Sequence, residues 1–369
     1  MNIMKKYLKI VGMVFCGLIM VTCLFNAKVL AKENENNKMP EENKLVKAKV
    51  IESMEKQGKE RKVKIIIEEG KYKGKELVVA NELRVSDSKP LVLKKGQRVI
   101  VYISEDGEGN LEETYIYEFV REKYIMVLVA IFILLLLIIG GFKGFKSILT
   151  LVITGLFVIK ILIPKIIKGS DPITTSIGVC IGIIIVTLII LNGFHKKTLS
   201  AIIGTSTGVI IAGIIALIMT KLMSLSGIDE QAFNLMQRVR GVDFSFQGIL
   251  FAGIILGALG AVMDVSMSIA SSMHEIAYNS RRISRQEIIR AGMNVGKDAM
   301  GTMSNTLILA YAGGALNVIM FFAAQNISLT YIINSQNIAS EIVRSLAGSI
   351  GLIITIPVTV FIAAFLEIK

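Results

Sequence analysis

The 369-residue chain is 53% hydrophobic, has a mean hydropathy of +0.63 and carries a formal net charge of +12. Its apolar residues are concentrated in runs of about 20, the length needed to cross roughly 30 Å of hydrocarbon. This composition excludes an ordinary soluble globular protein and indicates a membrane protein with several spans.

The basic excess does not indicate a protein that binds nucleic acid. Residues 32–123 hold 20 Lys and Arg against 19 Asp and Glu, so this segment is nearly neutral. The excess lies before and after it, where basic residues set the orientation of a membrane protein and contact anionic lipid. Cys16, Cys23 and Cys180 form no CxxC pattern of the kind found at metal or redox sites.

Residues 1–31 have the layout of a signal peptide, with early lysines, an apolar run from Ile10 to Phe25 and a small residue at Ala31. An uncleaved N-terminal anchor helix is the alternative, and both place the next segment outside the cytoplasm. Residues 32–44 are polar and poor in apolar residues, so we expect a flexible linker.

Residues 45–121 are predicted to form a small all-β domain outside the cytoplasm. Five β-branched or aromatic runs are separated by turn-forming residues, which fits a small barrel or sandwich, with an OB-like barrel as one option. The runs are LVKAKVI, KVKIIIE, ELVVANEL, QRVIVYI and TYIYEFV. Tyr115, Tyr117 and Phe119 alternate along the last run, and we expect them to pack in the core rather than to face a ligand.

Residues 122–369 are predicted to form an all-α membrane domain with about seven transmembrane helices. The expected spans are 124–142, 147–163, 173–193, 198–222, 246–272, 299–324 and 346–366. With the β-domain outside, Lys and Arg concentrate in the loops that would be cytoplasmic. We therefore expect a multi-pass membrane protein with the β-domain outside and a cytoplasmic C-terminus. The basic segment 280–296 is predicted to be an amphipathic helix on anionic lipid.

A polar stripe runs along the predicted span 246–272. At about 100° per residue, Asp264 shares one face with three glycines, two serines and a glutamate. These residues are Gly253, Gly257, Gly260, Ser268, Ser271 and Glu275. The glycines would permit close helix packing. Because a carboxylate at bilayer depth is costly and marks a functional site, we expect Asp264 to face a protein interior that water or a solute can enter.

A second polar stripe precedes and enters the predicted span 299–324. It consists of Asn294, Asp298, Thr302 and Asn305. If the two helices are antiparallel neighbours, Asp264 would lie level with Asn305, and Ser271 could face Asp298. Such groups suit a partly dehydrated cation, a proton relay or a polar solute. The alternative is that both stripes only join helices by hydrogen bonds.

The chain has no Walker A, GxSxG or HExxH pattern. Its two histidines, His195 and His274, are too few for a typical zinc site. We therefore expect no catalytic residue, no metal and no cofactor, and a protein that is not an enzyme.

The sequence also resembles a known family. The segments GALGAVMDVSMSIASSMHEI (257–276) and GMNVGKDAMGTMSNTLILAYAGGAL (292–316), together with the order of leader, β-domain and helical region, are similar to the YibE/F-like family of bacterial multi-pass membrane proteins. The resemblance implies a transporter or permease of the bacterial cytoplasmic membrane and does not name its substrate.

The sequence therefore predicts a secondary transporter or channel-like permease that moves an ion or small polar solute between two membrane helices. The alternative is a non-transporting membrane scaffold or accessory subunit that acts through its β-domain. Assembly as a homo-oligomer or with a membrane partner is compatible with both.

Overall fold

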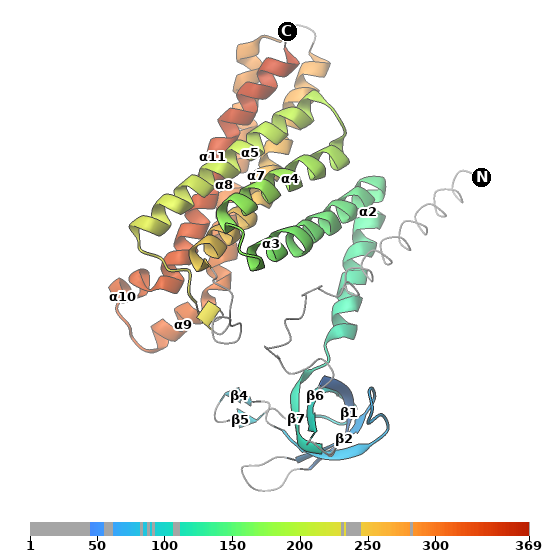
Figure 1. Cartoon of the computed structure of the whole chain (residues 1–369). Helices are drawn as coiled ribbons and strands as arrows, with labels where there is room; N and C mark the ends of the chain where they lie inside the picture. Colours follow the sequence, from blue (N-terminus) through green and yellow to red (C-terminus); the bar gives the residue numbers. More distant parts are fainter. Residues whose placement is uncertain are drawn as a thin grey trace, which may run out of the picture. The chain divides into compact units, whose positions relative to one another are not determined.

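The structure is a computed structural model of the chain (Figure 1). It describes residues 45–54, 62–81, 84–86, 89–90, 93–105, 111–229, 232–233, 245–280 and 283–368. The predicted signal peptide or anchor (1–31) and linker (32–44) lie outside these residues. The described chain divides after Leu134 into two compact units, a β-domain unit and a helical unit.

The first unit is a closed barrel of five strands in the order β1-β2-β3-β7-β6. The strands are β1 (Leu45–Met54), β2 (Lys62–Ile67), β3 (Glu76–Ala80), β6 (Arg98–Glu105) and β7 (Leu111–Phe119). The β3–β7 pair is parallel and its neighbours are antiparallel. This order confirms the predicted β-domain and is that of an OB-like barrel. Two short strands that were not predicted, β4 (Arg84–Ser86) and β5 (Lys89–Pro90), form a separate sheet.

The last strand corrects the expectation for its aromatic residues. The barrel core takes Ile116, which is 2% exposed, whereas Tyr117 is 48% exposed. A β-bulge at this point changes the phase of the strand, so that Phe119 pairs with Val99 and packs against the core. Tyr115 pairs instead with Tyr102 and stacks on it, with ring centroids 5.0 Å apart.

The second unit is helical. Its first helix, α2 (Glu122–Leu156), begins in the β-domain unit. The helices that follow are the π-helix η2 (Phe157–Leu162), α3 (Ile163–Ile167), α4 (Pro172–Asn192), α5 (Lys196–Leu222), α7 (Phe246–Asn279), α8 (Arg285–Gly314), α9 (Leu316–Ala324), α10 (Leu329–Asn334) and α11 (Gln336–Glu367). Among the described residues, five helical stretches are long and apolar enough to cross a membrane, or six if α8 and α9 form one span.

The first of these stretches, Glu122–Ile167, contains two of the predicted spans. Gly141 interrupts it with non-helical backbone (φ 54°, ψ −127°), which favours glycine because a side chain is strained at positive φ. The interruption falls inside the predicted span 124–142, one residue before its end and close to the predicted break before the span 147–163. Each of the seven predicted spans therefore corresponds to helical structure.

The predicted span 299–324 differs from the structure at its start and in its interior, whereas its predicted end coincides with the end of α9 at Ala324. The helix begins earlier, at Arg285, where Ser284 and Glu287 form a capping box that satisfies the first backbone N–H groups. The amphipathic segment is therefore continuous with the span. After Gly314 the chain bends by 58° into α9. Gly313 and Gly314 are poor helix formers, which accounts for a break at this point.

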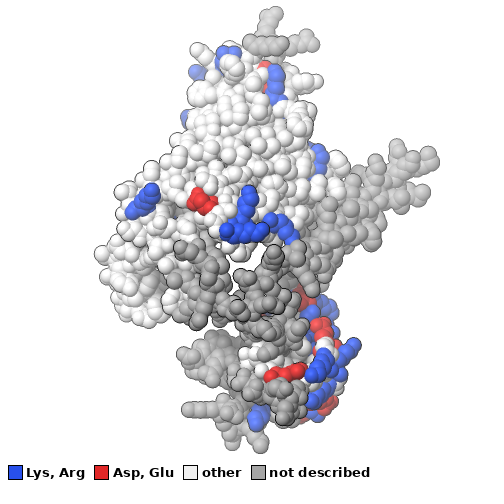
Figure 2. All heavy atoms as spheres, viewed as in Figure 1, with Lys and Arg blue, Asp and Glu red and all other residues white. Residues whose placement is uncertain are grey.

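The helical unit exposes large apolar side chains that a soluble protein would bury. Ile214, Ile218 and Phe361 are 50%, 51% and 58% exposed. On the face drawn in Figure 2, Lys and Arg gather toward the two ends of the helical unit, and the surface between them is largely uncharged. An uncharged band between charged ends is what lipid tails require, so this unit is a membrane domain.

The centre of the helical unit is formed where α5, α7 and α11 pack together. A Cβ atom on Gly204 or Gly208 of α5 would clash with the hydroxyls of Thr359 and Thr355 of α11. The Thr355 hydroxyl donates to the Gly204 carbonyl (3.3 Å), and the Thr359 hydroxyl donates to Ser266 of α7 (3.3 Å). Small residues and buried hydroxyls thus join the three helices, as is common in membrane bundles.

We expect Gly208→Ala to destabilise the helical domain by about 1–3 kcal/mol, because an added methyl group in a packed interface forces its neighbours apart. Unfolding of the purified full chain in detergent measures the effect. Gly178→Ala is the matched control, since no heavy atom lies within 4 Å of a Cβ placed there. Equal unfolding midpoints for the two variants would contradict the packing described.

Candidate functional site

Asp264 lies on the outer face of α7, opposite the face that packs in the bundle. Val262, Val265 and Ile269 are at most 1% exposed, whereas Asp264 and its neighbours on the stripe are accessible. Ser268 and Glu275 are exposed and Ser271 is half-buried. The described helices alone therefore do not enclose the stripe, although the sequence suggested an interior position. Helical periodicity groups residues on one face but does not decide which face turns inward.

The second stripe also lies on an outer face, that of α8. Asn294, Asp298, Thr302 and Asn305 are all exposed. The opposite side of the same helix carries its buried residues, which are Ile288, Gly292, Gly296 and Leu307. The eight predicted site residues thus occupy the outer faces of two helices.

Helices α7 and α8 are antiparallel neighbours. Three residue pairs define their register: Gly257 with Tyr311, Ile269 with Gly296, and Met273 with Gly292. Interpolating between these contacts places Asp264 level with Thr302. The sequence predicted Asn305, about one helical turn away.

The stripe residues do not join the described helices to one another. Among the described residues, no hydrogen bond runs from one stripe to the other, and the Thr302 hydroxyl donates within its own helix to Ala299 (3.1 Å). The hydroxyls that do link helices belong to Ser266, Thr355 and Thr359, on the buried faces. Helix–helix adhesion within this domain therefore does not explain the stripes.

The three glycines of the stripe have different surroundings. Gly257 lies against the Tyr311 hydroxyl, and the atom nearest to a Cβ on Gly253 would be Nη2 of Arg344, at 3.7 Å. A Cβ on Gly260 would meet no heavy atom within 4 Å, so close packing between described helices does not account for this glycine. The three stripe positions of α7 between Arg344 and Asp264 thus lack side chains of their own, and Tyr311 packs over the middle one.

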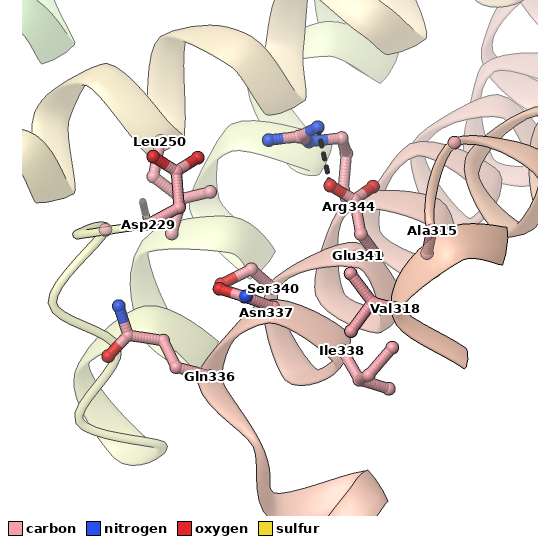
Figure 3. Close-up of a pocket in the computed structure, with 12 residues that line it drawn as sticks. Asp229, Leu250, Ala315, Val318, Gln336, Asn337, Ile338, Ser340, Glu341 and Arg344 are labelled. Carbon is pink, nitrogen blue, oxygen red and sulfur yellow. Dashed lines mark hydrogen bonds and ion pairs between the residues drawn. The ribbon is translucent and has the colours of Figure 1, made fainter. Parts of the chain in front are cut away.

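A cavity of about 390 Å³ lies at the end of the helical domain where α11 begins (Figure 3). Its wall comes from the segment after α5, the start of α7, the α8–α9 bend and the start of α11. Residues that line it include Asp229, Leu250, Val318, Ser340, Glu341 and Arg344.

Arg344 links this cavity to the α7 stripe. Its Nη1 donates to Glu341 Oε1 at 2.9 Å, and its guanidinium lies 5.7 Å from the ring centroid of Tyr311. Its Nε is buried without a hydrogen-bond partner among the described residues. An unpaired buried donor costs about 1–3 kcal/mol, which makes this edge of the guanidinium a place for a ligand or a water to bind. From Gly253, beside Arg344, to Asp264 is roughly 16 Å along the helix.

Sequence reasoning did not assign Glu341, Arg344 or Tyr311 to the site. The available signal was a pair of opposite charges three residues apart, immediately before the predicted span 346–366. Since α11 begins at Gln336, both charges lie inside the helix. Their convergence with Asp229 and Tyr311 depends on contacts between distant segments.

At the other end of α7, the histidine is paired with a carboxylate. His274 Nδ1 lies 2.9 Å from Oε1 of Glu367, whose side chain is 8% exposed. Arg285 donates to the carbonyl of Ile368 (3.2 Å), which also attaches the end of α11. The described residues contain no group of three or more His, Cys, Asp and Glu suited to a metal ion.

The β-domain has a larger cavity of about 1190 Å³ beside the start of α2. Its bases outnumber its acids, and the acids are largely engaged: Lys47 pairs with Glu122 (3.0 Å), and Arg98 with Glu68 (2.9 Å). The hydrogen bond to Glu122 raises the pKa of Lys47. The remaining lysines make this surface attractive to anions.

If the stripe is hydrated in the membrane, Ser268→Cys should react with a charged, membrane-impermeant thiol reagent at least about tenfold faster than Ile214→Cys, because thiolate forms only where water is present. Ile214 is the matched apolar position, 50% exposed on α5, and buried Ser266→Cys is a second control. The variants are compared in a background that lacks the three native cysteines. Equal rates at 268 and 214 would show that lipid covers the stripe.

Two protein-family models match the chain. The model described as YibE/F-like protein matches residues 128–369, and the model described as YibE/F family N-terminal domain matches residues 28–119. No curated protein and no solved structure matches the chain. The two family matches meet where the barrel gives way to the first membrane helix. The chain therefore belongs to the YibE/F-like family.

Proposed function

We propose that the protein is a secondary transporter or channel-like permease that moves an ion or small polar solute along the outer polar face of α7 and α8. The observation that supports it is the line of polar and glycine positions from Arg344, past Asp264, to Glu275. No cofactor and no enzymatic step are part of the proposal.

The polar face needs a cover other than lipid. A carboxylate at the centre of a membrane helix costs about 2.5–3.5 kcal/mol on insertion scales, and neighbouring polar groups add to this. In the proposal, a second copy of the chain or another membrane protein covers the face and leaves a hydrated path between the two surfaces. Gly260 and Gly301 leave room for such a path, since a Cβ on either would meet no heavy atom within 4 Å.

Each stripe residue has a role in this path. Asp264 is the central polar ligand or proton carrier, because it is the charge farthest from both ends of α7. Ser268, Ser271, Thr302 and Asn305 replace lost hydration with hydroxyl and amide groups. Glu275 and Asp298, together with Asn294, form the mouth near the start of α8.

The topology follows from the distribution of basic residues. With the β-domain outside and the C-terminus in the cytoplasm, the mouth at Glu275 is cytoplasmic and the Arg344 cavity faces outward. The basic first turns of α8 then lie against the anionic lipid of the cytoplasmic leaflet.

The β-domain supports a second candidate function. Tyr102 and Tyr115 are half-buried and stack on each other, and Tyr117, two residues after Tyr115 in the same strand, is 48% exposed. Exposed aromatic side chains are enriched at protein interfaces. In this alternative the chain is a scaffold or accessory subunit that holds a partner through the barrel, and the α7–α8 face packs against a membrane subunit.

Under the transport proposal, Asp264→Asn reduces solute flux to the level of a deletion strain while the protein is still expressed and inserted. Growth and flux are profiled across ions and small solutes in a deletion strain that carries each variant. Asp171→Asn is the matched control, because Asp171 caps α4 through Thr174 and lies off the stripe. Full flux in Asp264→Asn cells would refute the proposed role.

The two candidate functions respond differently to changes in the barrel. We expect Tyr102→Ser with Tyr115→Ser to leave flux within about twofold of wild type, because neither residue lies on the transport path. The same strains are used, with partner capture by crosslinking as a second measurement. A null phenotype in the double variant, combined with a silent Asp264→Asn, would favour the scaffold function.

A further inference from the structure

We infer that the cavity at the start of α11 binds a small zwitterion, with the carboxylate on Arg344 and the ammonium group on Asp229. The class that fits is an α-amino acid with a short aliphatic side chain. This inference rests on the proposed transport function and names the substrate class that would enter the path at its outer end.

Arg344 offers the carboxylate half of the site. Its Nη1 is occupied by Glu341, whereas its Nε and Nη2 make no hydrogen bond among the described residues. Nε and Nη2 form the side-on edge of a guanidinium, whose two parallel N–H groups match the two oxygens of a carboxylate. The ring of Tyr311 and the pair with Glu341 hold the guanidinium in place, so the edge is already oriented.

Asp229 offers the ammonium half. It lies in the segment after α5 and lines the cavity with Arg344 from a different part of the chain (Figure 3). Its Oδ1 accepts from the Ala232 N–H (2.7 Å), and its Oδ2 has no hydrogen-bond donor among the described residues. No ion pair joins Asp229 to Arg344 in the described chain, so a ligand with both charges can bridge them.

The other residues of the cavity wall determine which side chain the amino acid can carry. Leu250, Val318 and Ile338 provide an apolar surface, and Ser340 and Asn337 provide hydroxyl and amide groups. A cavity of about 390 Å³ lies at the small end of the usual range for ligand sites, about 300–1,000 Å³. A short aliphatic side chain fits the apolar wall, and a large solute does not fit the volume.

The charges of the described wall argue against ligands of a single sign. Two carboxylates, Asp229 and Glu341, face one guanidinium. A simple anion would be repelled by the carboxylates, and a simple cation would leave the free edge of Arg344 unpaired. A neutral solute would leave charges on both sides of the cavity without partners.

The test is direct binding of glycine, L-alanine, L-valine and L-leucine to the purified full chain in nanodiscs, measured by calorimetry up to about 10 mM. We expect at least one of L-alanine, L-valine and L-leucine to bind. L-Valinamide, which lacks the carboxylate, and isovalerate, which lacks the ammonium group, should each bind at least about tenfold more weakly than L-valine.

Two conservative variants test the carboxylate half and the ammonium half of the site separately. Arg344→Lys keeps the charge beside Glu341 but removes the side-on edge, and we expect it to weaken binding at least about tenfold. Asp229→Asn keeps an oxygen for the Ala232 N–H and removes the charge, with the same expected loss. Asp171→Asn makes the same change at a helix cap outside the cavity and should bind like wild type.

Absence of binding by all four amino acids overturns the inference, as does equal binding of L-valine and its two analogues. Binding that is unchanged in Arg344→Lys or Asp229→Asn also overturns it. The proposed function is judged separately by Asp264→Asn, which should keep binding at the cavity while losing flux. Asp264-dependent flux without amino-acid binding would reject only this inference, and binding without any flux would reject only the transport proposal.

Discussion

The close packing of α11 against α5 and α7 determines where the polar residues of the membrane domain lie. Gly204 and Gly208 bring α11 so near to α5 that a methyl group would not fit between them. Inside this contact the Thr355 hydroxyl donates to the carbonyls of Gly204 and Gly351, and the Thr359 hydroxyl donates to the Ser266 hydroxyl. The apolar face of α7 packs in this interface. The opposite face, which carries Asp264, therefore points outward.

The polar residues of this domain fall into two classes, those buried between helices and those, such as Asp264, on the outer face. Buried hydroxyls such as Ser266 hold helices together, which is the ordinary use of serine and threonine in membranes. The stripes on α7 and α8 have no such partners among the described residues. An acid that neither joins helices nor belongs in lipid needs water, a solute or a second protein beside it. The transport proposal and the expectation of an assembly partner both follow from this requirement.

The α8–α9 bend connects the stripe to the cavity. Helix α8 crosses α7 so that Tyr311 reaches Gly257 near one end, while Gly296 and Ile269 meet near the other. The chain then turns at Ala315, a residue of the cavity wall, and leaves space beside the first turns of α11. Arg344 occupies that space and reaches Gly253 from it. Arg344 at the cavity thus lies beside the face of α7 that carries Asp264, roughly 16 Å from Asp264 along the helix.

The sequence by itself determined the class of the molecule, its two-part organisation and the members of each polar stripe. Apolar runs of span length, β-branched runs and a 3.6-residue period are local patterns. Such patterns can be recognised in the sequence without knowing which distant residues are in contact. For this reason the spans, the five barrel strands and the shared face of Asp264 and Ser268 could be predicted. The outward direction of that face, the phase change at the bulge before Phe119 and the level of Asp264 beside Thr302 were decided only by tertiary structure. The position of Asp229 and Arg344 on the wall of one cavity was likewise decided by tertiary structure. All of these features depend on contacts between side chains that are far apart in the sequence.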